Sequence, residues 1–184
     1  MYSKLNDKES IYFQTNLMYN FLIKERQMAE LRPIIDAQGK NEQPMRYFQI
    51  FLDGIDKTGK DLIRSYIFYL GKGRYICVAR GIASMRVYSQ LYDRPYLYDD
   101  ASQQNVMNVL LTVDKEDWVI RCKTSNEPLT DYDKETQMFN DVFDDLERKG
   151  YNVLRYNTST FTPYTIAKMI VNHMEKLNGL QQND

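Results

Sequence analysis

Residues 46–62 read Arg-Tyr-Phe-Gln-Ile-Phe-Leu-Asp-Gly-Ile-Asp-Lys-Thr-Gly-Lys-Asp-Leu, and this stretch decides the fold. The apolar run over 47–52 predicts a strand, and residues 59–70 have the spacing of a helix. Between them, Gly54, Gly59 and Lys60 have the G-x-x-x-x-G-K spacing of a phosphate-binding loop. In such a loop, backbone N–H groups and the N-terminus of the next helix surround a polyphosphate, and the lysine contacts its terminal phosphates. The stretch therefore predicts a strand, a phosphate-binding loop and a helix in succession.

Asp61 is the residue of this loop that departs from the pattern. The position after the lysine normally holds Ser or Thr, whose hydroxyl binds a nucleotide-bound Mg²⁺, whereas Asp places a carboxylate near the phosphates. Two like charges about 4 Å apart repel by roughly 1 kcal/mol in water and roughly 4 kcal/mol at a partly desolvated site. We therefore predict that Mg·ATP binds weakly or not at all, although a carboxylate can also bind Mg²⁺ directly. The residues predicted to retain the shape of the loop are Gly54, Lys57, Thr58, Gly59, Lys60 and Asp61.

The composition argues against several other classes of function. The 184 residues include 24 basic and 25 acidic side chains, so we expect no direct binding of nucleic acid and no membrane surface. Cys77, Cys122 and the lone His173 have no metal-ligand spacing, so we expect reduced cysteines in the core and no zinc site. No run reaches the roughly 18 apolar residues of a membrane span and no signal peptide is recognisable, which predicts a cytoplasmic protein.

Strand and helix patterns alternate along most of the chain, which predicts an α/β fold with a parallel sheet covered by helices. The predicted strands lie at 47–52, 74–78, 105–113 and 151–156, and the predicted helices at 59–70, 81–92, 114–122, 132–149 and from 162 onward. Asp114 and Thr162 are the predicted N-caps of two of these helices. We divide the chain into an N-terminal helical extension with its connector (1–45), the main domain (46–178) and a tail (179–184).

Two regions outside this alternation are candidates for a partner surface. The pattern over 7–31 predicts an amphipathic helix, and its apolar stripe must be buried on the chain's own sheet or on a partner, because large exposed apolar patches are rare on monomers. A loop after residue 92 combines arginine with several of the 15 tyrosines, and such side chains often anchor protein interfaces. The candidate contact residues are Ile11, Met18, Phe21, Arg94, Tyr96 and Tyr98.

Three stretches of the chain resemble the thymidylate kinase and deoxynucleotide kinase branch of the P-loop kinases, particularly the divergent kinases of large bacteriophages. Residues 51–60 resemble the family's phosphate-binding loop, residues 76–88 its strand ending in Asp-Arg, and residues 109–121 the strand and helix that lead into its lid. The resemblance covers residues 46–178. It implies a P-loop kinase-like three-layer fold, in which helices flank a short parallel sheet of about four strands.

The departures from this family fall on the residues that perform its chemistry. Asp61 replaces the Mg²⁺-binding hydroxyl, and Ala79 replaces the aspartate of the Asp-Arg pair, of which only Arg80 is kept. The lid normally supplies several arginines, and here it offers only Lys123 and Lys134. Since phosphoryl transfer depends almost entirely on positioning and charge stabilisation, these losses together predict a protein without catalysis.

An intact Asp-Arg pair, Asp93 and Arg94, lies further along the chain and is an alternative match to the motif. Residues 85–91 before it have helical rather than strand spacing. We therefore prefer Ala79 and Arg80 as the residues at the end of the second strand.

The resemblance and its departures lead to one expected function. We expect a noncatalytic kinase-fold protein, a pseudoenzyme without a cofactor, that acts by binding another protein. The phage resemblance implies a host-takeover factor in the host cytoplasm, and a component of the host transcription machinery, such as RNA polymerase, is one candidate partner.

Two alternatives remain beside it. The first is an active thymidylate-like deoxynucleoside monophosphate kinase that uses ATP and Mg²⁺. Its catalytic residues would be Lys60, Arg80 and Arg121, and its metal ligands would be Asp53, Asp56 and Asp61. The second alternative is a nucleotide-binding sensor without turnover.

Overall fold

The computed structural model describes residues 34–35, 41–42, 48–96 and 105–179. Contacts within the chain divide it into two units, Met1–Met45 and Arg46–Asp184, at the same position as the boundary drawn from the sequence. In the first unit, β1 (Ile34–Ile35) pairs in antiparallel fashion with β2 (Asn41–Glu42). The helix predicted over 7–31, with Ile11, Met18 and Phe21, lies outside the described residues, and so does Tyr98.

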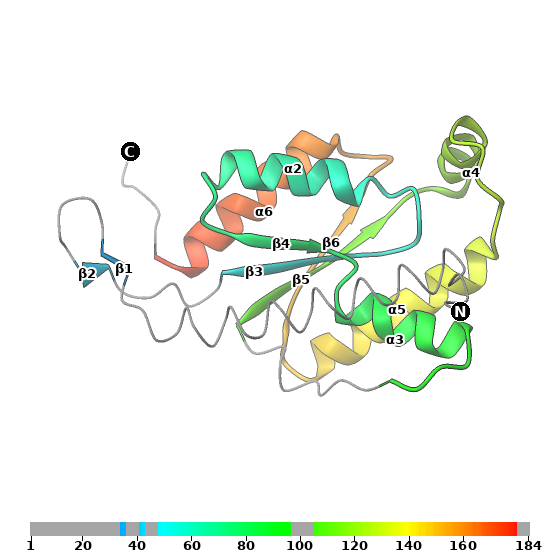
Figure 1. Cartoon of the computed structure of the whole chain (residues 1–184), viewed down its shortest axis with the longest axis horizontal. Coiled ribbons are helices and arrows are strands. Elements are labelled where there is room, and N and C mark those ends of the chain that lie inside the picture. The colour runs from blue at the N-terminus through cyan, green and yellow to red at the C-terminus, as the bar shows by residue number, and fades with distance from the viewer. Residues whose placement is uncertain (1–33, 36–40, 43–47, 97–104, 180–184) are drawn as a thin grey trace, which may run out of the picture. The chain divides into compact units, whose positions relative to one another are not determined.

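The second unit is built on a four-stranded parallel sheet with the strand order β4-β3-β5-β6 (Figure 1). Its strands are β3 (Gln49–Asp53), β4 (Ile76–Ala79), β5 (Val106–Thr112) and β6 (Asn152–Asn157). Its helices are α2 (Lys60–Leu70), α3 (Ile82–Leu91), α4 (Lys115–Thr124), α5 (Tyr132–Arg148) and α6 (Pro163–Leu177). The predicted α/β fold class, with helices flanking a short parallel sheet, is confirmed.

The two central strands differ from the two edge strands in burial. Every residue of β3 is buried, and so is every residue of β5 except Thr112, because helices cover both faces of these strands. The edge strands β4 and β6 are only partly buried. Burial on both faces therefore favours continuous apolar runs in the two central strands, and these runs made the strands recognisable in the sequence.

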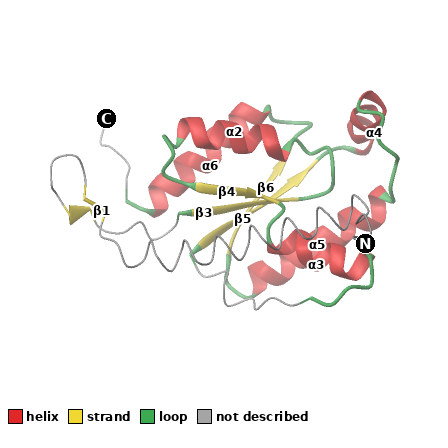
Figure 2. Ribbon diagram, viewed as in Figure 1, coloured by secondary structure: helices red, strands yellow, loops and turns green. Residues whose placement is uncertain are grey.

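Helices cover the sheet on both sides and form a three-layer structure (Figure 2). Helix α2 packs against α6 on one side, and α3 packs against α5 on the other. A core cluster extends from the sheet into α3, α4 and α5, with Phe139 and Phe143 of α5 at most 1% exposed and Trp118 of α4 at 4%. This cluster fixes α4 near the carboxyl ends of the strands (Figure 1).

The helix caps agree with the sequence in part. The Thr162 hydroxyl accepts a hydrogen bond from the backbone N–H of Thr165, as an N-cap does. Asp114 stands at the N-cap position of α4, but the prediction that its side chain caps the helix was wrong. Its carboxylate instead accepts a hydrogen bond from Asn157 Nδ2 at 2.7 Å, because the end of β6 lies beside it. Within the described ranges, no helix is both long and apolar enough to cross a membrane.

Candidate functional site

The candidate site lies at the carboxyl ends of the parallel strands, where ligands of open α/β sheets usually bind. The loop 54–59 follows β3 and leads directly into α2 (Figure 1). Arg80 follows the last residue of the neighbouring strand β4, and Thr158 follows the last residue of β6. The sheet topology therefore gathers residues that are widely separated in sequence around one loop.

Two glycines shape the loop for different reasons. Gly54 has φ +131°, and a Cβ at this position would overlap the backbone carbonyl oxygen of Leu111 on β5. Gly59 has φ +78°, but no atom lies within 4 Å of the position of its Cβ. Gly54 is therefore required by both conformation and close packing against the sheet, and Gly59 by conformation alone.

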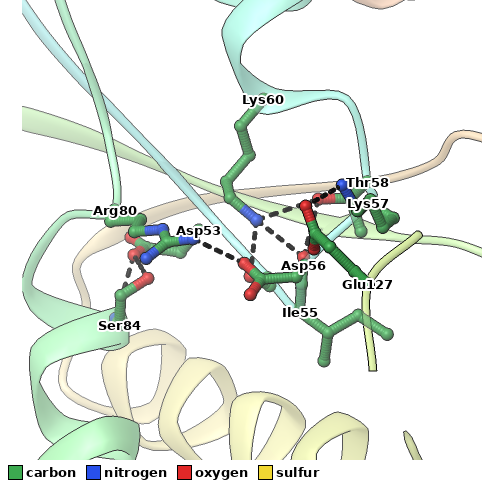
Figure 3. Close-up of polar contacts among 10 residues, drawn as sticks. Asp53, Ile55, Asp56, Lys57, Thr58, Lys60, Arg80, Ser84 and Glu127 are labelled. Atoms are coloured by element: carbon green, nitrogen blue, oxygen red, sulfur yellow. Dashed lines mark hydrogen bonds and ion pairs between the residues drawn. The ribbon is translucent and has the colours of Figure 1, made fainter. Parts of the chain in front are cut away.

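The side chain of Lys60 folds back into the loop that precedes it (Figure 3). Its ammonium donates hydrogen bonds to the carbonyl oxygens of Gly54 at 2.8 Å and Ile55 at 2.6 Å, and to the Thr58 hydroxyl at 3.2 Å. Lys60 is only 7% exposed, and this burial lowers its pKa to about 8, with Asp56 acting in the opposite direction. To contact a phosphate, the ammonium must exchange at least one protein acceptor for a phosphate oxygen.

Asp53 connects the end of β3 to the start of α3. Its Oδ1 accepts hydrogen bonds from the backbone N–H of Ser84, at 2.9 Å, and from the Ser84 hydroxyl. Its Oδ2 is buried and has no hydrogen-bond partner among the described residues. Burial raises the pKa of this carboxyl group, against the lowering effect of the Ser84 hydrogen bonds. The contacts of Asp53 thus support a structural role in orienting α3.

Arg80 occupies the position that we preferred for the arginine of the Asp-Arg motif. It has φ +70° and lies directly after β4, and its guanidinium forms an ion pair with Asp56 of the loop at 2.7 Å. The alternative pair, Asp93 and Arg94, lies beyond the end of α3, and the Arg94 N–H donates to the carbonyl of Ser89. The structure therefore confirms that Ala79 is the last residue of the second strand of the sheet, β4. The pair Asp93 and Arg94 follows a helix instead of a strand.

Arg121 of α4 joins the loop to the end of β6. Its guanidinium donates to the carbonyl oxygen of Lys57 at 3.0 Å, and to the hydroxyl and carbonyl oxygens of Thr158, both at 2.9 Å. Thr158 is buried, and its hydroxyl also donates to the carbonyl of Thr112. Arg121 therefore fixes the relative positions of three segments.

Two residues of the site carry no recognisable sequence signal. Thr158 follows a strand without any motif, and Glu127, which forms an ion pair with Lys57, lies in the loop between α4 and α5. The Lys57 and Glu127 side chains are 70 positions apart in sequence. No local pattern predicts such a contact, because it depends on where α4 packs.

Asp61 lies in the first turn of α2, directly after Lys60. Its side chain is 81% exposed and forms an ion pair with Arg64 at 3.0 Å, one turn further along α2. Because this carboxylate is exposed, its repulsion of a bound phosphate would fall at the weak, solvent-screened end of the range. Position 61 still lacks the Ser or Thr hydroxyl that binds Mg²⁺ in a phosphate-binding loop.

The three candidate metal ligands of the kinase alternative do not converge. Asp53 is bonded to Ser84, Asp56 to Arg80, and Asp61 to Arg64. The part of the chain that the structure describes contains no group of three or more His, Cys, Asp or Glu side chains able to hold a metal ion.

Of the predicted partner-binding residues, only Arg94 and Tyr96 are described. Arg94 lies just beyond α3, and its guanidinium lies over the ring of Tyr92 with 5.9 Å to the ring centroid. Both Arg94 and Tyr96 are partly buried. They lie on the segment that follows α3, whereas the loop 54–59 follows β3.

Comparisons with known proteins identify the fold. No family model matches the chain, and no curated protein matches its sequence. The chain is similar to the crystal structure of YorR protein from Bacillus subtilis in complex with phosphorylated GDP, with a TM-score of 0.59 and 14% sequence identity. The match covers 73% of this chain and 99% of YorR. At this identity the likeness establishes the fold alone, and the chain has a P-loop-type, nucleotide kinase-like α/β fold.

Proposed function

We propose that this protein is a noncatalytic member of the kinase-like fold that acts by binding another protein. The observation that carries the proposal is that the four basic side chains around the loop all bind groups of the protein itself. Lys57 pairs with Glu127, and Arg80 pairs with Asp56. Lys60 donates to loop oxygens, and Arg121 donates to Thr158 and to a loop carbonyl.

The strength of these contacts differs, and the difference matters for catalysis. Partly exposed ion pairs such as Arg80 with Asp56 contribute only about 0.2–1 kcal/mol, so a phosphate can compete for Arg80. Arg121 makes three hydrogen bonds, and bonds to a charged group contribute roughly 1.5–3 kcal/mol each. An arginine that contacts the transferred phosphoryl group accelerates the reaction by about 10³–10⁵. Three of the five N–H donors of Arg121 are already bonded within the protein, which supports a structural role for this side chain.

The finer assignment follows the resemblance of residues 51–60, 76–88 and 109–121 to the thymidylate and deoxynucleotide kinases of large bacteriophages. On this basis we propose a phage pseudoenzyme that modulates a host protein during takeover of the host cell. A component of the host transcription machinery, such as RNA polymerase, is one candidate partner. The resemblance, rather than any contact in the structure, supports this part of the proposal.

A retained deoxynucleoside monophosphate kinase activity is the competing proposal, and the geometry of the loop favours it. Gly54 and Gly59 keep the backbone shape of the loop, and Lys60 lies within it. With a pKa of about 8, Lys60 is still mostly protonated at neutral pH and able to contact a phosphate. ATP and Mg²⁺ would then be the cofactors, Lys60 would contact the phosphates and Arg80 would contact the phosphoryl acceptor.

The experiment that separates these proposals uses one sample of the full-length protein. It is incubated with ATP, Mg²⁺ and each of the deoxynucleoside monophosphates, and ADP formation is measured beside a calorimetric titration with Mg·ATP. We expect no ADP above the level of a Lys60→Ala control and no saturable binding at micromolar Mg·ATP. Binding without turnover would support the sensor, and turnover that is lost in Lys60→Ala would establish the kinase.

A further inference from the structure

The two edges of the four-stranded sheet are protected to different degrees. Strand β6, at one edge, contains Arg155, whose guanidinium pairs with Asp144 and Glu147 of α5. Strand β4, at the other edge, reads Ile-Cys-Val-Ala and contains no charged residue and no proline. Charged residues and prolines are the usual means by which proteins prevent other strands from pairing with a sheet edge. Of the two edges that the structure describes, β4 is the one that lacks this protection.

The backbone of β4 presents hydrogen-bonding groups on its outer side. The N–H of Ile76 donates to the carbonyl of Phe48 at 2.9 Å, and the N–H of Arg80 donates to the carbonyl of Leu52 at 2.8 Å. In a parallel strand, alternate residues direct both backbone groups to the same neighbour. The N–H and C=O groups of Cys77 and Ala79 therefore point to the outer edge, where an added strand would bond to them.

A cavity of about 420 Å³ lies beside this edge, between α2 and β4. It is lined by Arg64, Ser65, Phe68, Tyr75 and Cys77. The Phe68 ring is exposed, with 67% of the residue accessible, and the pKa of the Cys77 thiol is raised by burial, so that the thiol is neutral. The cavity thus combines the Phe68 ring with hydroxyl and thiol side chains and a single cationic side chain, Arg64.

We infer that the outer edge of β4 binds an extended segment of a partner protein, which pairs with the sheet as an additional strand. An apolar side chain of that segment enters the cavity against Phe68, and an acidic side chain of the same segment contacts Arg64. This inference rests on the proposed function, because it names the surface through which the protein binds its partner.

Three observations specify this kind of partner. The outward N–H and C=O groups of Cys77 and Ala79 require an extended polypeptide backbone, since a helix has no free backbone groups to pair with them. The cavity, which includes the exposed Phe68 ring, accepts one side chain of the added strand, whose side chains on one face recur every second residue. The Arg64 side chain is 42% exposed, and its ion pair with the 81% exposed Asp61 is of the weak surface kind that a partner carboxylate can replace.

Charge around the edge favours the same partner. Lys72 and Arg74, which precede β4, and Arg80, which follows it, are all basic. Arg74 pairs with Glu175 and Arg80 with Asp56, so these two keep internal partners. Lys72 is exposed. The exposed Lys72 and the weakly paired, partly exposed Arg64 therefore place positive charge beside the edge, which favours an acidic segment.

The test is a selection of short random peptides from a displayed library on the full-length protein, followed by affinity measurements with the best peptide on single-residue variants. We expect selected peptides that alternate apolar with other residues, contain an acidic residue and lack proline. Phe68→Ala should weaken binding of that peptide by about tenfold, because the anchor side chain loses its wall. Tyr69→Ala is the matched control, because Tyr69 is adjacent on α2 and 76% exposed but does not line the cavity. The affinity of this variant for the peptide should differ from that of the wild type by less than about twofold.

A second variant and a second measurement test the strand pairing itself. Ala79→Pro removes an outward N–H and leaves the bond from Arg80 to Leu52 intact, so it should abolish binding of the peptide. Hydrogen exchange on the wild-type protein should show slower exchange at Cys77 and Ala79 when the peptide is bound, which tests the pairing even where Ala79→Pro fails to fold.

Three results would overturn the inference. These are equal losses in Phe68→Ala and Tyr69→Ala, unchanged exchange at Cys77 and Ala79, and a stable dimer of the protein that dissociates in Ala79→Pro, which would identify a second copy as the occupant of the edge. The proposed function fails by a different measurement, the formation of ADP. The peptide result and the enzyme result are therefore separable.

Discussion

The ammonium of Lys60 lies 2.6 Å from the carbonyl oxygen of Ile55, five residues before it, so the lysine of the loop binds the backbone of its own loop. Two more oxygens, the carbonyl of Gly54 and the hydroxyl of Thr58, accept its remaining hydrogens. The charge of Lys60 is thereby satisfied without a nucleotide.

This relationship predicts a pH dependence of stability. Burial lowers the pKa of Lys60 from 10.5 to about 8, so between these values the unfolded state binds more protons than the folded state and stability rises with pH. Lys60→Met removes this dependence. The difference in free energy of unfolding between wild type and Lys60→Met should therefore shift in favour of the wild type, by up to about 2 kcal/mol, from about pH 7.5 to pH 9.5.

Urea unfolding at several pH values between these limits measures that difference. Taking the difference between two proteins cancels the titration of the tyrosines, which is common to both. A flat difference across the range would show that Lys60 is not desolvated in the folded protein.

The two loop glycines should differ in their tolerance of alanine. Gly54→Ala forces a Cβ against the carbonyl of Leu111 as well as an unfavourable φ, so we expect a loss of about 3 kcal/mol or more. Gly59→Ala meets no atom within 4 Å and should lose only about 1–2 kcal/mol. Urea denaturation of both variants checks the difference. Equal losses would contradict the close approach of the loop to β5.

Arg121 should contribute to stability rather than to turnover. Arg121→Ala removes its hydrogen bonds to Thr158 and to the carbonyl of Lys57, and should lower the free energy of unfolding by about 2–4 kcal/mol. Lys123→Ala, an exposed residue on the same helix, is the control and should change it by less than about 0.5 kcal/mol. Thermal unfolding distinguishes the two. If Arg121→Ala unfolds at the same temperature as the wild type, the hydrogen bonds of Arg121 contribute little to stability. The guanidinium would then be available to bind a ligand.

Restoring the missing hydroxyl should improve binding without restoring catalysis. Asp61→Thr replaces an exposed carboxylate with the group that binds Mg²⁺ in phosphate-binding loops, so the affinity for Mg·ATP should increase several-fold, by about 1 kcal/mol. ADP should still not form, because Ala79 remains and Arg121 remains bonded to Thr158. Calorimetry and an ADP assay on the same sample check both parts. Formation of ADP by Asp61→Thr would contradict this prediction. It would show that Asp61 alone prevents the wild-type protein from catalysing phosphoryl transfer.

Asp53 provides a test of buried charge. Burial raises its pKa, so the folded state holds the proton more tightly than the unfolded state, and stability is lost as pH rises above 3.8. Asp53→Asn keeps an oxygen to accept from Ser84 and carries no charge, so we expect it to match or exceed the wild type at pH 7. Asp53→Ala leaves the buried N–H and hydroxyl of Ser84 without this acceptor and should lose about 1–3 kcal/mol.

The sequence by itself determined the elements and their order. Apolar runs such as Ile50 to Leu52 and Val109 to Leu111 are buried on both faces of a parallel strand, and their periodicity is local, so it is visible without the fold. The glycines of the loop were also recognisable, since their spacing reports a backbone conformation that few other residues adopt. These signals predicted the four strands of the sheet, the helices that the structure describes in the second unit and the loop after the first strand of its sheet.

Only the tertiary structure decided which charges meet. Arg121 reaches Thr158, 37 positions away, and Lys57 reaches Glu127, 70 positions away, because α4 packs near the carboxyl ends of the parallel strands. The capping prediction for Asp114 failed for the same reason, since Asn157 competes for its carboxylate. The partner of a side chain at a strand end is a residue of a neighbouring strand end or helix. Which residue that is depends on strand order and helix packing, which sequence spacing does not encode.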